Sequence, residues 1–198
     1  MSKNLLLPAV SRELEFIARN VAAADAIYNN DIRVPQSITE LTRAVYDRAD
    51  SQVGSLLHML EEEVSQAAKG IVRIKWTNTN RAELWRIFGT VHKILGKKKL
   101  GLAGVFFPRY VKPLHLVGWM KPLGGLDGRK RIARSCAGKI DDVKVVSEHP
   151  KQYPGWPRDD DVVIWFDQKL TLSTSRDELC KELGLLAKRF FKIVIRTV

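Results

Sequence analysis

Apolar residues recur every three or four positions along the first third of the chain. Between residues 9 and 27 the repeating apolar positions are Leu14, Ile17, Ala18, Val21 and Ala24. A second series runs from Leu41 to Val64. This spacing places the apolar side chains on one side of an α-helix. The pattern therefore predicts two amphipathic helices, over residues 9–27 and 37–68.

Two short motifs indicate where helices begin. Ser37 with Glu40, and Ser175 with Glu178, have the spacing of a capping box. In such a box the two side chains bond the free backbone N–H groups at a helix start. Helices are therefore expected to begin near Ser37 and Ser175, and a break in the first of them is expected near residues 50–54.

Beyond Gly70 the apolar period changes from helical to alternating. In residues 71–76 (IVRIKW), apolar positions alternate with Arg73 and Lys75, which is typical of a strand with one basic, exposed face. Further short apolar runs predict strands over residues 102–107, 114–119, 143–146, 162–166 and 191–196. Helical spacing and caps predict helices over residues 80–96, 129–137 and 175–190.

The predicted fold class is α+β, with a helical N-terminal layer followed by a mixed sheet. After residue 70 the elements follow the ferredoxin-like order β-α-β-β-α-β, with a C-terminal β-α-β extension. We expect an acidic helical region over residues 1–69 and a basic α+β body over residues 70–198, either as two parts or as one continuous domain.

Positive charge is concentrated in the middle of the chain. The whole sequence has a formal net charge of +11. Residues 69–134 contain 16 Lys and Arg against 2 Asp and Glu, whereas residues 1–68 contain 6 against 10. A basic excess confined to one segment is typical of a surface that binds a polyanion, and nucleic acid is the partner that we expect. RNA and DNA, single strands and duplexes, are all compatible with this pattern.

Basic and aromatic side chains in this segment are the candidate nucleic-acid contacts. The candidates for phosphate contacts are Lys97, Lys98, Lys99, Arg109, Lys112, Arg129, Lys130, Arg131 and Arg134. Tyr110 and Trp119 are the candidates for stacking on bases, since they fall in a predicted loop and at a predicted strand end.

The stretch KPLGGLDGRKRIARS, residues 121–135, combines glycines with four cations near the start of a predicted helix. Glycines let the backbone approach an anion closely, and the N–H groups of a helix start point toward it. Arginine adds bidentate phosphate contacts. The stretch also fits a solvated turn beside a charged helix, but its place in the basic segment favours a phosphate contact.

An enzymatic alternative comes from Asp167 and Lys169 at the end of a predicted strand. The tripeptide DQK at these positions resembles the (D/E)xK element of metal-dependent nucleases, with Asp141 or Asp142 as a candidate second carboxylate. The resemblance implies carboxylates that hold Mg²⁺ and a lysine that positions the attacking water. The same tripeptide pattern recurs at residues 142–144, and no zinc motif is present. We therefore expect a non-enzymatic protein without metal or cofactor, with a Mg²⁺-dependent nuclease as the alternative.

Partners and compartment follow from the remaining features. The acidic helices are a second candidate interface, for a protein partner. The chain has two cysteines, Cys136 and Cys180, which form no CxxC pair. This usage favours a reducing, intracellular location, in the cytoplasm, a nucleoid or a nucleus. No apolar run is long enough to span a bilayer, so no membrane association is expected.

Overall fold

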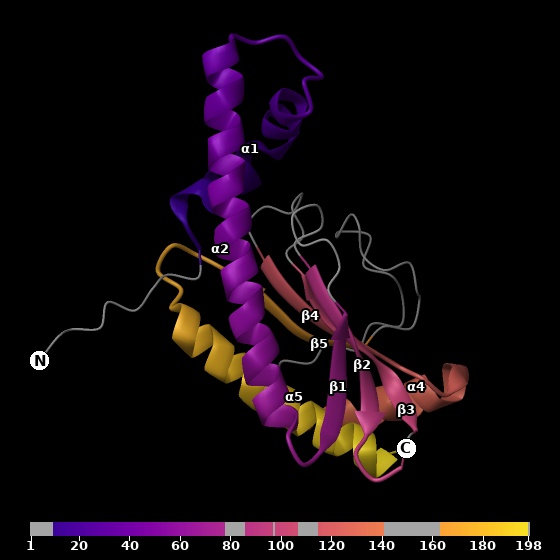
Figure 1. Ribbon diagram of the computed structural model, residues 1–198. Coiled ribbons are helices and arrows are strands. Elements are labelled where there is room, and N and C mark those ends of the chain that lie inside the picture. The colour runs from indigo at the N-terminus through magenta and orange to yellow at the C-terminus, as the bar shows by residue number, and fades with distance from the viewer. Residues whose placement is uncertain (1–9, 78–85, 97, 107–114, 141–162, 198) are drawn as a thin grey trace, which may run out of the picture.

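Helices and an antiparallel sheet together form the structure. The computed structural model describes residues 10–77, 86–96, 98–106, 115–140 and 163–197 (Figure 1). These residues contain four helices and one five-stranded sheet. The fold class is therefore α+β, as the sequence predicts. The predicted strand over residues 143–146 lies outside the described residues.

A helical hairpin forms the N-terminal part. It consists of α1 (Arg12–Tyr28) and α2 (Gln36–Ala68). α1 begins at a side-chain cap, because the Ser11 Oγ accepts a hydrogen bond from the Leu14 N–H at 3.0 Å. Figure 1 shows the hairpin extending well beyond the sheet.

α2 is one continuous helix of 33 residues, which corrects two predictions. It has no break at residues 50–54, where Val53 is buried in the apolar stripe that continues through this stretch. It begins after Pro35 without a side-chain cap. The predicted capping box of Ser37 and Glu40 is therefore not formed.

The five described strands form one sheet that is antiparallel throughout, and not the mixed sheet that the sequence predicts, because each strand pairs with the strand that follows it in the chain. Their bounds are β1 (Val72–Thr77), β2 (Arg86–Lys93), β3 (Lys99–Phe106), β4 (His115–Pro122) and β5 (Val163–Lys169). Their order is β1-β2-β3-β4-β5, so each strand pairs with the strand next to it in the chain. Residues that are directly opposed in register lie on the same face, which assigns side chains to the two faces of the sheet.

The strand β2 replaces part of a predicted helix over residues 80–96. Its residues pair with β1 on one side and with β3 on the other. Ile87, Gly89 and Val91 are buried at alternating positions, so the apolar spacing that fits a helix also fits a strand. The ferredoxin-like order needs a helix between its first two strands and is not confirmed.

α5 (Arg176–Thr197) is a long C-terminal helix. The prediction of a strand over residues 191–196 is wrong, because α5 continues through them with Phe191 fully buried. The predicted helix start is correct, since the Ser175 Oγ accepts a hydrogen bond from the Glu178 N–H at 3.4 Å. Neither α5 nor any other described helix combines the length and the apolarity needed to cross a membrane.

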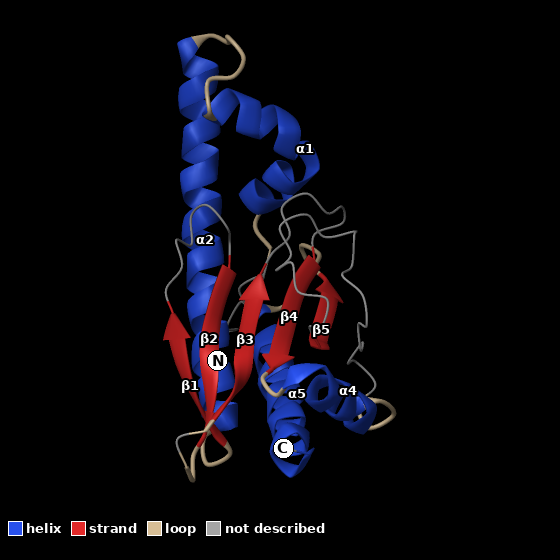
Figure 2. Ribbon diagram, turned by 90° about the vertical axis from the view of Figure 1, so that its right-hand side faces the viewer, coloured by secondary structure: helices blue, strands red, loops and turns tan. Residues whose placement is uncertain are grey.

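α2 and α5 pack together and cover one face of the sheet, which we call the inner face (Figure 2). Trp76 of β1 points toward α2, where its indole Nε1 donates to the Ser65 Oγ at 2.8 Å. Val105 and Met120 lie on the same face and are fully buried. The hydrophobic core therefore lies between the sheet and this helix pair.

α4 (Gly125–Cys136) follows β4 after a turn that contains two glycines. Gly124 has φ of 142° and Gly125 has φ of 71°, in the region that favours glycine over other residues. The helix begins earlier than the predicted start at Arg129. Asp127 and the glycine after it therefore lie in its first turn, and not in a turn that precedes it.

Candidate nucleic-acid interface

Several cation-bearing segments meet at one end of the sheet. Register places the start of β1, the turn between β2 and β3 and the end of β4 at this end. The defining pairs are Val72 with Lys93 and Gly101 with Pro122. α4 begins at this end and α5 finishes there, as Figures 1 and 2 show. Segments from the middle and the end of the chain are thereby brought together.

Backbone hydrogen bonds hold two of these segments in place. In the turn between β2 and β3, the Lys93 N–H donates to the Lys98 carbonyl oxygen at 3.0 Å. Beside it, the Leu123 N–H donates to the Leu100 carbonyl oxygen at 2.8 Å. The residues just before α4 therefore lie next to the start of β3, where Lys99 is exposed.

α4 directs cations outward because its other side is buried. Ile132 is 1% exposed and Cys136 is 0% exposed. A helix that packs on one side leaves its polar side chains on the other. The exposed cations of α4 are Lys130, Arg131 and Arg134.

The last turns of α5 add two more cations. Lys192 and Arg196 are exposed, and their i,i+4 spacing places them on the same side of the helix. Phe191 and Val194 are fully buried, which fixes the outward direction of the basic side. These cations reach the sheet end because residues 191–196 are helical.

We call this surface the basic end. Its described cations are Lys69, Arg73, Lys93, Lys98, Lys99, Lys121, Arg129, Lys130, Arg131, Arg134, Lys192 and Arg196. The described parts of these segments contain a single acidic residue, Asp127. Like charges gathered in this way raise the free energy of the folded state, and a bound polyanion relieves that repulsion.

The basic end continues onto the outer face of the sheet, the face opposite α2 and α5. Arg73 and Lys75 are exposed at alternating positions of β1. Register places Lys75, Thr90, Leu102 and Lys121 in one row across four strands. Neighbouring strands lie about 4.8 Å apart, so roughly 14 Å separates the two lysines of the row. A lysine therefore lies at each end of this row, and the half-buried Thr90 and Leu102 lie between the two lysines.

Trp119, a predicted stacking residue, lies on the outer face and packs on the sheet itself. It is opposite Gly104 in register, and a Cβ on Gly104 would lie 2.6 Å from the indole Nε1. The indole therefore occupies space that only glycine leaves open. Because Trp119 is 8% exposed, little of its ring is accessible to a base in this conformation. Phe88, in the same row, is half-buried and offers more surface.

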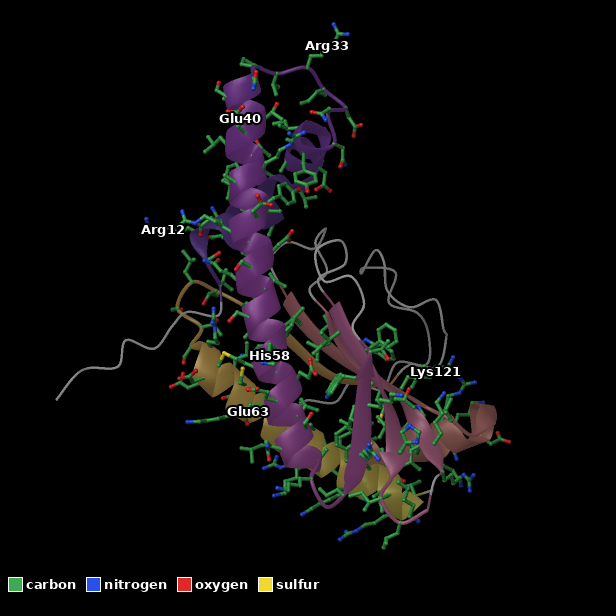
Figure 3. All side chains as sticks on the ribbon, viewed as in Figure 1. Arg12, Arg33, Glu40, His58, Glu63 and Lys121 are labelled. Carbon is green, nitrogen blue, oxygen red and sulfur yellow. The ribbon has the colours of Figure 1, made fainter. Side chains whose placement is uncertain are left out.

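The ion pairs found among the described residues lie away from the basic end. The ion pairs Arg19–Glu15, Arg48–Glu13 and His58–Glu62 all lie within α1 and α2. Figure 3 shows Arg33 and Glu40 at the tip of the hairpin and Lys121 beside the sheet. α2 spans about 50 Å, whereas the Debye length at physiological salt is about 8 Å. Charges at the hairpin tip therefore contribute little to the potential at the basic end.

Some predicted contact residues are brought together and others lie outside the described residues. Lys98, Lys99 and the four cations of α4 are all at the basic end. Outside the described residues are Lys97, Arg109, Tyr110 and Lys112. β3 ends at Phe106 and β4 begins at His115, at the opposite end of the sheet.

Two of the candidate nuclease residues, Asp167 and Lys169, lie apart from the basic end. Asp167 and Lys169 are in the last part of β5, where Lys169 pairs with His115 at the opposite end of the sheet. Asp141 and Asp142 lie outside the described residues. In the part of the chain that the structure describes, no three His, Cys, Asp or Glu side chains are grouped in a way that could hold a metal ion.

Both cysteines are buried and protonated at neutral pH. Burial raises the pKa of Cys136 to about 11, although nearby Lys139 lowers it. Burial, together with the carboxylates of Glu63 and Asp177, raises the pKa of Cys180 to about 12. A thiol is nucleophilic as the thiolate. Cys136 and Cys180 therefore act as small apolar core residues.

Seven cations of the basic end and the adjoining outer face are not among the predicted contacts: Lys69, Arg73, Lys75, Lys93, Lys121, Lys192 and Arg196. Arg73 and Lys75 were visible as the basic positions of an alternating strand, but nothing in that pattern connects β1 to α4. Lys192 and Arg196 join the surface only when α5 is helical to its end. The available signal was the three- and four-residue spacing of the buried residues that runs through all of α5.

Comparisons of the chain with protein-family models, with curated proteins and with solved structures found no match.

Proposed function

We propose that the protein binds nucleic acid through the phosphate backbone, without catalysing a reaction, as an accessory component of a nucleoprotein assembly. The observation that carries the proposal is the convergence of cations from β1, the turn between β2 and β3, α4 and α5 on one end of the sheet. Phosphate contacts supply most of the non-specific affinity for nucleic acid. Lysines and arginines gathered on one surface are their expected footprint.

The side chains of the basic end suit phosphate better than base edges. Arg131 and Arg134 offer planar, bidentate donors to phosphate oxygens, whereas Lys98 and Lys99 act as point charges. Phosphate contacts position a protein on nucleic acid but carry no sequence information. We therefore expect weak sequence preference and strong salt dependence.

The test is a binding panel over single- and double-stranded DNA and RNA, measured by fluorescence anisotropy at several salt concentrations, with and without Mg²⁺. We expect the logarithm of the binding constant to fall linearly with the logarithm of the salt concentration. The triple variant Lys130→Ala/Arg131→Ala/Arg134→Ala should reduce the steepness of this slope on duplex DNA by roughly 2.7, which is about 0.9 for each phosphate that is no longer neutralised.

The matched control removes the same charge from the helical hairpin. Arg12, Arg33 and Arg43 are exposed residues of this hairpin, and Figure 3 shows Arg12 and Arg33 there. Replacing all three with alanine should leave the slope unchanged. Equal reductions in both triple variants would indicate a net-charge effect and contradict the proposal, as would an unchanged slope in both.

The same panel distinguishes the alternatives. Mg²⁺-dependent cleavage of a labelled strand would favour the nuclease. Failure to bind any of the four nucleic acids, combined with capture of a protein partner by the helical hairpin of the full chain, would favour a protein-docking role.

A further inference from the structure

Two exposed aliphatic side chains lie among the lysines of the basic end. Leu95 is 85% exposed and Ile94 is 47% exposed, in the turn between β2 and β3. Leu95 is the most exposed large apolar residue in the described chain. Tight turns usually carry Gly, Asn, Asp, Ser or Pro. Adjacent aliphatic residues at this position do not serve the turn itself, and they are not part of the core.

The two side chains lie where β2 leads into the turn, at the end of a paired strand. The Lys93 N–H bonds to the Lys98 carbonyl oxygen at 3.0 Å and closes the turn. Gly96 has φ of 100°, which lets the chain reverse direction. β2 is paired on both sides, with β1 and β3. Leu95 therefore projects from the end of a supported strand pair.

We propose that Ile94 and Leu95 form an apolar wedge that enters the minor groove of a base-paired duplex and partly unstacks one base step. The inference rests on the proposed function, because the exposed Lys93, Lys98 and Lys99 beside the tip would hold the phosphates on either side. Minor-groove proteins insert Leu, Ile, Met, Phe or Pro between bases and kink the duplex, with Arg and Lys contacts in the groove.

The distribution of charge around the tip favours a duplex over a membrane surface. The cations continue away from the tip, along α4 and onto the outer face of the sheet at Arg73 and Lys75. A duplex that runs past the tip can contact this extended surface, whereas a planar lipid surface at the tip would not contact much of it. Ile94 and Leu95 also offer fewer carbons than a myristoyl chain, which alone gives only marginal membrane binding.

The experiment uses the full chain with short DNA and RNA duplexes that carry a fluorescence donor and acceptor at their ends. Binding of the wild-type chain should raise energy transfer, because a kink shortens the end-to-end distance. Leu95→Ser should abolish this rise and weaken duplex binding by about tenfold, since a hydroxyl group replaces the apolar side chain that the base step would bury. Its salt slope and its affinity for single strands should stay unchanged. Leu95→Phe, which keeps an apolar wedge, should retain the rise.

The matched control is Leu185→Ser, which replaces another exposed leucine, on α5, and should behave as the wild-type chain. Two results would contradict the wedge and leave the proposed function standing. One is salt-dependent duplex binding without a rise in energy transfer, and the other is an equal rise in the wild-type chain and in Leu95→Ser. Absence of binding to every nucleic acid would overturn both. Both would also be overturned if the chain bound only anionic phosphatidylserine vesicles and Leu95→Ser lost that binding.

Discussion

A methyl group added at Gly104 would meet both the indole of Trp119 and the backbone of β2. Its carbon would lie 2.6 Å from the indole Nε1, 2.7 Å from the indole Cε2 and 2.8 Å from the carbonyl oxygen of Ile87. The indole can rotate, but the Ile87 carbonyl belongs to the sheet backbone and shifts only if strand pairing is disturbed. Gly104→Ala is therefore expected to destabilise the folded state.

The expected loss of stability follows from two opposing effects of Gly104→Ala. Inserting a methyl group into a packed site costs about 1–3 kcal/mol. Replacing glycine with alanine inside a strand contributes about 0.5–1 kcal/mol in the opposite direction. At the middle of the two ranges the net loss is about 1 kcal/mol. In a chain of 198 residues this lowers the melting temperature by about 2–4 °C, which thermal and urea unfolding followed by circular dichroism can measure.

Two further variants separate the local clash from a general effect of alanine. Gly54 lies inside α2, and a methyl group added there would have no neighbouring atom within 4 Å, so Gly54→Ala should stabilise the protein by about 0.5–1 kcal/mol. In a Trp119→Phe background, the smaller ring should reduce the effect of Gly104→Ala, which a double-mutant cycle measures. A Gly104→Ala chain as stable as the wild type would refute the packing of the indole on β3.

The remaining predictions concern α5, the thiols and the candidate metal ligand. Lys192→Ala/Arg196→Ala should reduce the salt slope of binding to duplex DNA by about 1.8; no change in salt-titrated anisotropy would place the end of α5 outside the interface. At pH 8, Cys136 and Cys180 should react with Ellman's reagent at least about 100-fold more slowly than unfolded thiols, because their pKa values are raised; fast reaction in the native state would contradict their burial. The ordinary thiol pKa is 9.0, and burial raises it to about 11 for Cys136 and about 12 for Cys180. The unfolded chain therefore loses these protons first, and the urea midpoint should fall between pH 8 and pH 10. Asp167→Ala should leave nucleic-acid binding unchanged, and loss of a wild-type cleavage activity in this variant would instead support the nuclease.

Local periodicity was sufficient for several elements. α1 and α2 follow from apolar positions spaced by three and four residues, and β1 follows from the alternation of Arg73 and Lys75 with apolar neighbours. In each case one face is buried and the other is solvated, so a single period dominates. β3, β4 and β5 contain the short apolar runs that predict them, although their ends shift by a few residues.

Periodicity failed where an apolar run satisfies two periods. In β2, Ile87 and Val91 are four residues apart, which suits a helix, and they also flank Gly89 at alternating strand positions. Pairing with both neighbouring strands then decides the outcome. Residues 191–196 have the opposite ambiguity, because their apolar, β-branched run at 193–195 suits a strand but also continues the buried stripe of α5. Packing against α2 and the sheet extends the helix through them.

The candidate interface was predictable only in part. Lys98, Lys99 and the cations of α4 are close together in the sequence, so their charge density is visible without a fold. Arg73 and Arg196 come from distant parts of the chain, and they share a surface only through strand register and the direction of α5. The position of the Trp119 ring also depends on strand register. The ring lies on the sheet because its register partner on the neighbouring strand, Gly104, has no side chain.

The strand order β1-β2-β3-β4-β5 has a consequence for folding during synthesis. Adjacent strands that are consecutive in the chain pair with little loop-closure entropy, so hairpins such as β2–β3 can form early. The contact between α2 and α5, by contrast, joins segments from opposite ends of the chain. Until α5 has left the ribosome, it cannot cover its part of the inner face of the sheet, the face on which Val105 and Met120 are buried. α5 follows all five strands in the chain and therefore completes the core after them, and a chain truncated or stalled before α5 would expose an apolar sheet face to aggregation.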